Sequence, residues 1–125
     1  MISITKKFKF DAAHRLPYYD GACNRLHGHS FKLEVEVTGQ VQDQGPKTGM
    51  IMDFTDLKRM VNTVILCKVD HTDLNDEYIN PTAENMIYDF AVALKQEIRD
   101  CRLPITLVRL RLYETDDSYA EWRQE

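Results

Sequence analysis

Apolar and polar residues alternate along two stretches near the start of the chain. From Ile2 to His14 the even-numbered positions are apolar apart from Lys6 and His14 itself, and from His27 to about Val41 the odd-numbered positions are apolar after the two histidines, apart from Gly39. Because successive side chains of a strand point to opposite faces, each stretch predicts a β-strand with one buried face. The proline and the Asp-Gly step between them predict a loop, so we expect the two strands to pair antiparallel.

The apolar spacing changes to that of helices in the middle of the chain. Asp53 or Thr55 can cap a helix that runs to about Cys67, and Thr82 can cap a second helix directly after Pro81. Apolar residues at intervals of three and four form one stripe on each segment. On the second helix this stripe consists of Ala83, Met86, Ile87, Phe90, Ala91, Leu94 and Ile98.

Strand-like alternation returns in the last part of the chain. Val108, Leu110 and Leu112 share one face of a predicted third strand, and residues 118–123 are expected to form a short fourth strand, although their pattern is ambiguous. Two strands, two helices and two further strands predict an α+β fold, in which a four-stranded antiparallel sheet carries both helices on one face. A chain of 125 residues is expected to form a single domain, 1–125.

The composition is that of an ordinary soluble globular protein, with 43% hydrophobic and 29% charged residues. A net charge of −4 without a basic run argues against nucleic-acid binding, and no apolar run is long enough to span a membrane. The N-terminus lacks the apolar core of a signal peptide, so we expect a cytoplasmic protein. Cys23, Cys67 and Cys101 predict neither a disulfide framework nor a cysteine-type zinc site, and we expect the last two to pack in apolar surroundings.

Three of the four histidines lie on the apolar faces of the two N-terminal strands: His14, His27 and His29. A buried polar group without a partner costs free energy, and one metal ion would satisfy all three imidazoles. Three histidines on zinc leave one position for water or substrate, as in catalytic sites. Iron or copper also accept imidazoles, but nothing in the sequence indicates redox chemistry, so zinc is expected. The alternative is that His14 packs in the core while His27 and His29 cap a turn.

Other candidate residues lie outside these strand faces. Cys23 precedes the histidines in a polar loop, where a metal ion and Arg25 would favour its thiolate as a base or nucleophile. The alternatives are a fourth zinc ligand or an incidental loop cysteine. Asp70 and His71 are adjacent, and a carboxylate beside an imidazole is typical of acid–base pairs, although such a pair more often ends a helix.

Two carboxylates complete the set of candidates. Glu114 continues the apolar face of the third strand by one step, so its side chain is expected to point inward, where it needs a cation, a donor or a ligand. Glu84 lies in the first turn of the second predicted helix, where the helix dipole favours a carboxylate even without a ligand.

Six short blocks, in order along essentially the full chain, resemble the 6-pyruvoyltetrahydropterin synthase/6-carboxytetrahydropterin synthase family. They are residues 10–16, 23–29, 49–57, 69–75, 80–85 and 113–115. The three residues between Cys23 and His27 resemble the bacterial carboxy-forming enzymes of the queuosine and 7-deazaguanine pathway, since pyruvoyl-forming members typically have a longer gap. A third branch, which forms 6-hydroxymethyldihydropterin, carries glutamate in place of this cysteine.

The resemblance implies a tunnelling fold, in which sheets of several subunits join into a barrel, and a homo-oligomer, expected to be a hexamer of two stacked trimers. The implied reaction converts 7,8-dihydroneopterin triphosphate to 6-carboxytetrahydropterin, acetaldehyde and triphosphate. A pyruvoyl-forming synthase is the alternative enzyme. A zinc-binding or pterin-binding module without turnover is the alternative outside the enzymes.

The same resemblance implies a role for each candidate residue. The zinc ligands are expected to be His14, His27 and His29, the catalytic residues Cys23, Asp70 and His71, and the substrate contacts Glu114, Thr82 and Glu84. Glu114 matches the residue that anchors the pterin ring. His71 is expected to come from a neighbouring subunit.

Overall fold

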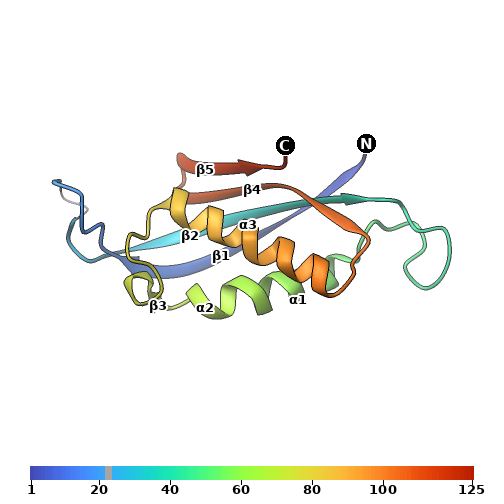
Figure 1. Ribbon diagram of the computed structural model, residues 1–125, viewed down its shortest axis with the longest axis horizontal. Helices are drawn as coiled ribbons and strands as arrows, with labels where there is room; N and C mark the ends of the chain where they lie inside the picture. The colour runs from blue at the N-terminus through green and yellow to red at the C-terminus, as the bar shows by residue number, and fades with distance from the viewer. Residues whose placement is uncertain (22–23) are drawn as a thin grey trace.

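The computed structural model describes residues 1–21 and 24–125 and has two layers, a long sheet and helices that cover one of its faces (Figure 1). In chain order the elements are β1 (Ser3–His14), β2 (His27–Gly39), α1 (Phe54–Val61), α2 (Cys67–Val69), β3 (Thr72–Asp73), α3 (Ala83–Asp100), β4 (Ile105–Thr115) and β5 (Ser118–Arg123). A π-helical turn, Asn62–Leu66, joins α1 to α2, and a 3-10 turn, Leu74–Asp76, follows β3. The predicted α+β class and the two helical segments are therefore confirmed.

The sheet has five strands in the order β3-β1-β2-β4-β5, which corrects the expected number of four. Four of the strands pair antiparallel, whereas β3 pairs parallel with β1 at Ala12 and Ala13. A strand of two residues is too short to show alternation, so its sequence carried no signal. Its pairing depends on how the segment after α2 returns to the edge of β1.

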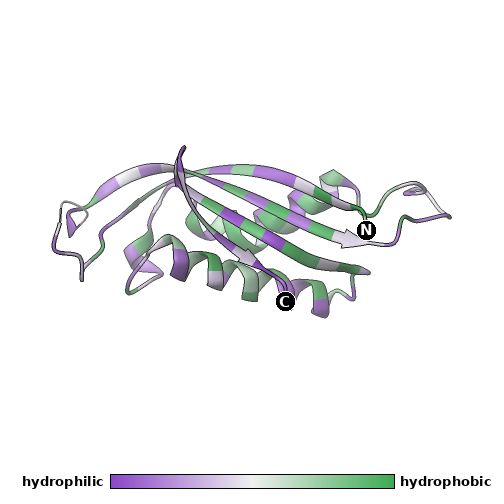
Figure 2. Ribbon diagram, turned by 90° about the horizontal axis from the view of Figure 1, so that it is seen from above, coloured by the Kyte–Doolittle hydropathy of each residue, from purple (hydrophilic) through white to green (hydrophobic). Residues whose placement is uncertain are grey.

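The core lies between the sheet and the two helical segments. The inward residues of β2 after its histidines, Phe31, Leu33, Val35 and Val37, are all 0% exposed. Figure 2 shows the corresponding alternation of hydrophobic and hydrophilic residues along the strands. Burial of this apolar face stabilises the fold by about 25 cal/mol per Å², and it fixes which face of each strand is turned towards the helices.

The outer face of the sheet is held by ion pairs between neighbouring strands. Arg109 of β4 contacts Glu36 at 2.7 Å and Glu34 at 3.3 Å, both on β2. Arg111 contacts Glu121 of β5 at 2.6 Å. The Arg109 side chain is only 16% exposed, and its charge is balanced by carboxylates of the neighbouring strand.

Two cysteines lie at the surface, which corrects the expectation that they pack in apolar surroundings. Cys67 and Cys101 are both exposed. Each thiol donates to a residue one turn earlier, Cys67 to the Thr63 carbonyl at 2.9 Å and Cys101 to Glu97 at 3.0 Å. The Glu97 carboxylate raises the pKa of the Cys101 thiol. Both residues therefore lie off the apolar stripes of their helical segments.

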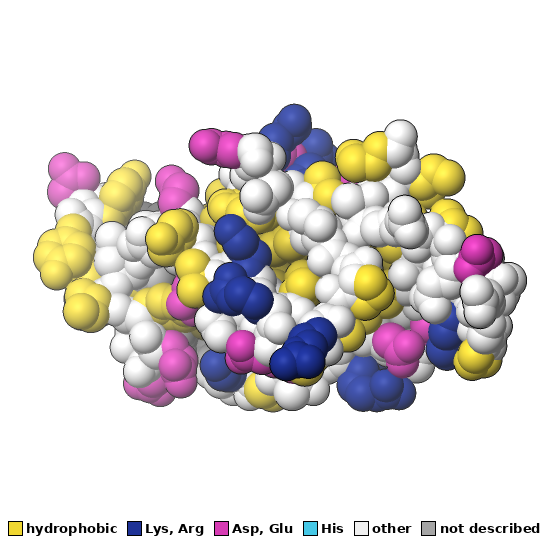
Figure 3. Space-filling model, turned by 45° about the vertical axis from the view of Figure 1, so that its right-hand side comes forward, with side chains coloured by type: hydrophobic (Ala, Val, Ile, Leu, Met, Phe, Trp, Pro, Cys, Tyr) yellow, Lys and Arg dark blue, Asp and Glu magenta, His cyan; other side chains and the backbone are white. Residues whose placement is uncertain are grey.

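The surface carries side chains of every kind. On the face shown in Figure 3, basic, acidic and apolar side chains are interspersed, and Lys and Arg gather near its centre. In the part of the chain that the structure describes, no helix is both long and apolar enough to cross a membrane.

Candidate metal centre and substrate cavity

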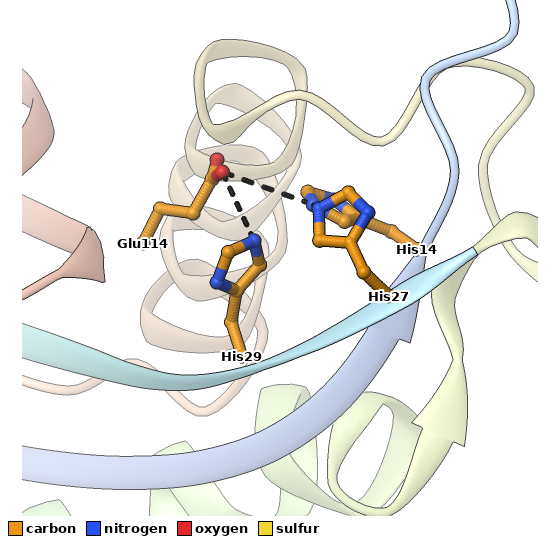
Figure 4. A group of neighbouring side chains, drawn as sticks. All are labelled: His14, His27, His29 and Glu114. Carbon is orange, nitrogen blue, oxygen red and sulfur yellow. Dashed lines mark hydrogen bonds and ion pairs between the residues drawn. The ribbon is translucent and has the colours of Figure 1, made fainter. Parts of the chain in front are cut away.

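Four side chains converge at one end of the sheet (Figure 4): His14 from the end of β1, His27 and His29 from the start of β2, and Glu114 from the end of β4. One potential ligand atom of each lies within 4.8 Å of the others. The strand register explains the convergence, because β1 and β2 pair with His14 opposite His27.

Glu114 occupies an irregular position of its strand. The pairing of β4 with β5 shifts register between Tyr113 and Thr115. Bulges of this kind bend a strand and redirect its side chains, and they are frequent beside active sites. The carboxylate lies 3.2 Å from His29 Nε2 and 3.8 Å from His14 Nε2.

In two of the imidazoles, a backbone carbonyl determines which ring nitrogen carries the proton. His14 Nδ1 lies 2.9 Å from the carbonyl of Pro81, and His27 Nδ1 lies 2.7 Å from that of Arg25. A carbonyl only accepts, so each Nδ1 must donate, and each neutral ring keeps a lone pair on Nε2. The Nε2 atoms of His14 and His27 are 3.1 Å apart, and when both rings are neutral with Nδ1 as the donor, neither Nε2 can donate to the other.

This arrangement fits a metal ion. Metal-binding histidines usually donate their other ring N–H to a carbonyl or carboxylate. Two nitrogens bound to one tetrahedral zinc at about 2.0–2.1 Å lie about 3.3–3.4 Å apart, close to the separation of the His14 and His27 nitrogens.

The third imidazole has a buried nitrogen without a partner. The side chain of His29 is 19% exposed, and its Nε2 makes no hydrogen bond among the described residues. Glu114 is close but lacks hydrogen-bond geometry. Burial lowers the pKa of His29, and this outweighs the Glu114 carboxylate, which acts to raise it. The neutral ring is the form that binds metals, and an ion at the centre would satisfy its free nitrogen.

Asp70 and His71 lie outside this cluster, at the edge of β1 that faces away from β2. His71 has a left-handed φ of 60°, and its Nδ1 contacts Asp70 Oδ1 at 2.9 Å. The backbone N–H of Asp11 donates to the same carboxylate at 3.0 Å and is the main reason that the pKa of Asp70 is lowered. The His71 side chain is 77% exposed, so the pair is open to another molecule.

A cavity of about 610 Å³ opens beside Glu114, between the start of α3 and β5. Its size is in the range of small-molecule sites. Glu84 lines the same cavity as Glu114. Thr82 is the N-cap of α3, and its hydroxyl accepts a hydrogen bond from the backbone N–H of Asn85 at 3.1 Å.

Sequence reasoning identified one part of the candidate site and missed another. Cys23 was singled out, but it lies outside the described residues. The carbonyls of Pro81 and Arg25 were missed, because every residue has a carbonyl and no pattern marks the ones that meet a histidine. Only the proximity of Arg25 to His27 in the sequence offered a hint.

Comparison with known proteins agrees with this architecture. The 6-pyruvoyl tetrahydropterin synthase family profile matches residues 3–125. The 6-carboxy-5,6,7,8-tetrahydropterin synthase of Haemophilus influenzae is 47% identical over 146 residues, which cover 99% of this chain and 100% of that protein. The enzyme of the same name from Synechocystis sp. is 44% identical over 84 residues, 65% of each chain. The structure of Caenorhabditis elegans 6-pyruvoyl tetrahydropterin synthase has a TM-score of 0.81 at 26% identity and covers 99% of this chain and 96% of its own. With a match along nearly its whole length and a shared fold, the chain belongs to the 6-pyruvoyl tetrahydropterin synthase family.

Proposed function

We propose that this chain converts 7,8-dihydroneopterin triphosphate and water to 6-carboxy-5,6,7,8-tetrahydropterin, with release of acetaldehyde and triphosphate, as a step in queuosine and 7-deazaguanine biosynthesis. The observation that carries the proposal is the cluster of three imidazoles and Glu114 next to a cavity of about 610 Å³. The relative that is 47% identical, a carboxy-forming synthase, supports this outcome over the pyruvoyl-forming one.

The proposed cofactor is zinc, held by His14, His27 and His29. The facing nitrogens of His14 and His27 and the unpartnered Nε2 of His29 support one ion shared by all three rings. When bound, zinc supplies a Lewis acid that polarises substrate oxygens and makes adjacent groups more acidic. The chain contributes the neutral rings and the carbonyls that orient two of them.

Glu114 is the proposed anchor of the pterin ring. A pterin presents a guanidine-like N–H edge, which one carboxylate can accept in two parallel hydrogen bonds. Glu114 borders both the imidazole cluster and the cavity, so a ring held there lies next to the metal ligands. Glu84 and Thr82 are also proposed to contact substrate, Glu84 from the cavity wall and Thr82 from the N-cap of α3.

Proton transfer is assigned to Cys23 and to the Asp70–His71 pair. The role of Cys23 as base depends on its place in the sequence, four residues before His27. Asp70 accepts from His71 Nδ1, which leaves Nε2 as the atom that exchanges protons. Asp70 also holds the ring near β1, since it is itself fixed by the N–H of Asp11.

The position of His71 supports a site shared between subunits. In one chain His71 lies outside the imidazole cluster and is 77% exposed. Among the described residues β5 has no strand on its outer side, and β3 covers only Ala12 and Ala13 of β1. Open sheet edges pair readily with another strand. We therefore propose a homo-oligomer, a hexamer of two stacked trimers, in which His71 serves the site of a neighbouring copy.

The first prediction concerns the product. The purified protein should release one acetaldehyde for each 7,8-dihydroneopterin triphosphate consumed, measured by a coupled alcohol dehydrogenase assay, with 6-carboxytetrahydropterin identified by mass. Release of triphosphate without acetaldehyde would instead identify a pyruvoyl-forming synthase. Binding without any turnover would identify a pterin-binding module.

The second prediction concerns the metal. The protein should carry about one zinc per chain, and His27→Ala should lose both zinc and activity because it removes one of three ligands. His71→Ala is the matched control, since the ring lies outside the cluster, and it should keep its zinc. Metal analysis of the purified variants decides. Full zinc content in His27→Ala would contradict the three-histidine centre.

The third prediction concerns the shared site. Cys23→Ala and His71→Ala chains should each be inactive alone. Mixed oligomers of the two should recover part of the activity, because some interfaces then contain both an intact Cys23 and an intact His71. Mixing is verified by native mass spectrometry. If verified mixed oligomers remain inactive, the site is contained within one chain.

The fourth prediction separates pterin recognition from metal binding. Glu114→Gln replaces one acceptor by a donor that faces the pterin N–H edge, so pterin affinity should fall by roughly 2–4 kcal/mol. Zinc content should match that of the parent, because Glu114 is not a proposed ligand. Calorimetry with a dihydropterin and metal analysis measure the two effects. Unchanged affinity would remove Glu114 from the anchor role, and loss of zinc would assign its carboxylate to the metal.

A further inference from the structure

The loop that enters α3 contacts the imidazole cluster through one backbone carbonyl. His14 Nδ1 lies 2.9 Å from the carbonyl of Pro81, and both residues are buried. This hydrogen bond determines which nitrogen of His14 carries the proton and how its ring is directed. A contact that fixes the direction of the Pro81 carbonyl therefore also fixes the direction of the His14 ring, whose Nε2 faces the other imidazoles.

The Pro81 carbonyl is itself held by a tight turn. The backbone N–H of Thr82 donates to the carbonyl of Asn80 at 2.9 Å, which places Pro81 at the centre of a three-residue turn. Proline has a fixed φ and no N–H, so the nitrogen of Pro81 cannot donate a hydrogen bond to hold the turn. The Thr82 N–H, which shares a peptide group with the Pro81 carbonyl, makes that hydrogen bond instead. The direction of the Pro81 carbonyl depends on how firmly the Asn80 carbonyl is held.

A side chain one turn into α3 supplies a second contact to this turn. Asn85 Nδ2 donates to the Asn80 carbonyl at 2.9 Å. Asn85 is exposed and belongs to none of the residues assigned to metal, substrate or proton transfer. Its backbone N–H is separately used by the Thr82 cap.

We propose that Asn85 is a positioning residue for the metal centre. Its amide holds the Asn80 carbonyl, which keeps the Pro81 carbonyl directed at His14 Nδ1 and so keeps the Nε2 of His14 directed at the ion. The proposal depends on the metal centre proposed above. Loss of a partner that orients a ligand directly lowers metal affinity by about 10–100-fold, and Asn85 acts one contact further out, so about tenfold is expected.

A structural role alone makes a different prediction. Asn85→Ala removes only the Nδ2 contact, because the backbone N–H still donates to Thr82. Alanine is also the stronger helix former, by up to about 0.7 kcal/mol. If Asn85 served stability alone, this substitution should change the thermal midpoint slightly and leave the affinity of the folded protein for zinc unchanged.

The test is zinc affinity of the folded full-length protein, measured by competition with a chromophoric chelator. Asn85→Ala and Asn85→Asp should both weaken zinc binding about tenfold, because neither side chain donates to the Asn80 carbonyl. The absorption spectrum of bound Co²⁺ should also change, since it reports ligand geometry. Gln96→Ala is the matched control: it removes an amide from the same helix whose side-chain hydrogen bonds, among residues 1–21 and 24–125, are to Asp100 and Arg99, and it should behave as the parent.

The possible results distinguish the two proposals. If the parent binds zinc and both Asn85 variants bind it equally well with the same Co²⁺ spectrum, the positioning role is wrong while the metal centre stands. If the parent itself binds no zinc, the metal centre is wrong and the positioning role falls with it. If Gln96→Ala weakens binding as much as Asn85→Ala, the effect belongs to the helix as a whole and the positioning role is again wrong.

Discussion

Three imidazoles at the end of an apolar sheet face impose the main constraint on this protein, because the ring of His14 and the Nε2 of His29 are buried and buried ring nitrogens need partners. Two rings meet backbone carbonyls through Nδ1, and the Nε2 of His29 has no hydrogen-bond partner among the described residues. The apolar residues that continue the same strand face, beginning with Phe31, hold the cluster against the core. The core therefore provides the rigid support that a preorganised centre needs, and the free nitrogens provide the capacity to bind.

The antiparallel register converts separate sequence positions into one centre. His14 lies at the last residue of β1 and His27 at the first residue of β2, so their pairing closes the hairpin at the cluster. Glu114 arrives from β4, where an irregular pairing with β5 redirects the strand. A change of register by one residue would turn these side chains to the outer face, so the cluster and the apolar core depend on the same pairing.

The segment between α2 and α3 contacts the C-terminal end of β1 through several of its residues. The backbone of His71 donates to the carbonyl of Asp11 at 2.6 Å, β3 pairs with the next two residues, and Asn75 exchanges two hydrogen bonds with the backbone of Arg15. Pro81 then meets His14. The same segment thus carries the exposed Asp70–His71 pair, which is proposed to serve a neighbouring copy, and contacts the buried His14 of its own chain.

Periodicity along the chain was enough to predict the strand and helix segments and most of their inward faces. On β4 the prediction was wrong for Val108, because an irregular pairing with β2 buries Leu107 together with Leu110 and Leu112. Alternation is a local property, so His14, His27, His29 and Glu114 could be placed on inward faces without any knowledge of the chain path. Asp70 and His71 were recognised as a pair, although their direct contact needed the left-handed conformation that only the structure shows.

The remaining features of the fold and the site depend on contacts between segments that are distant in the sequence. The fifth strand, the carbonyls that orient the rings and the exposure of the two helix-end cysteines depend on how distant segments meet. A carbonyl is present at every residue, and a strand of two residues has no period. Neither leaves a mark in the sequence, so the contacts that orient the metal ligands became visible only once the loop before α3 was placed against the end of β1.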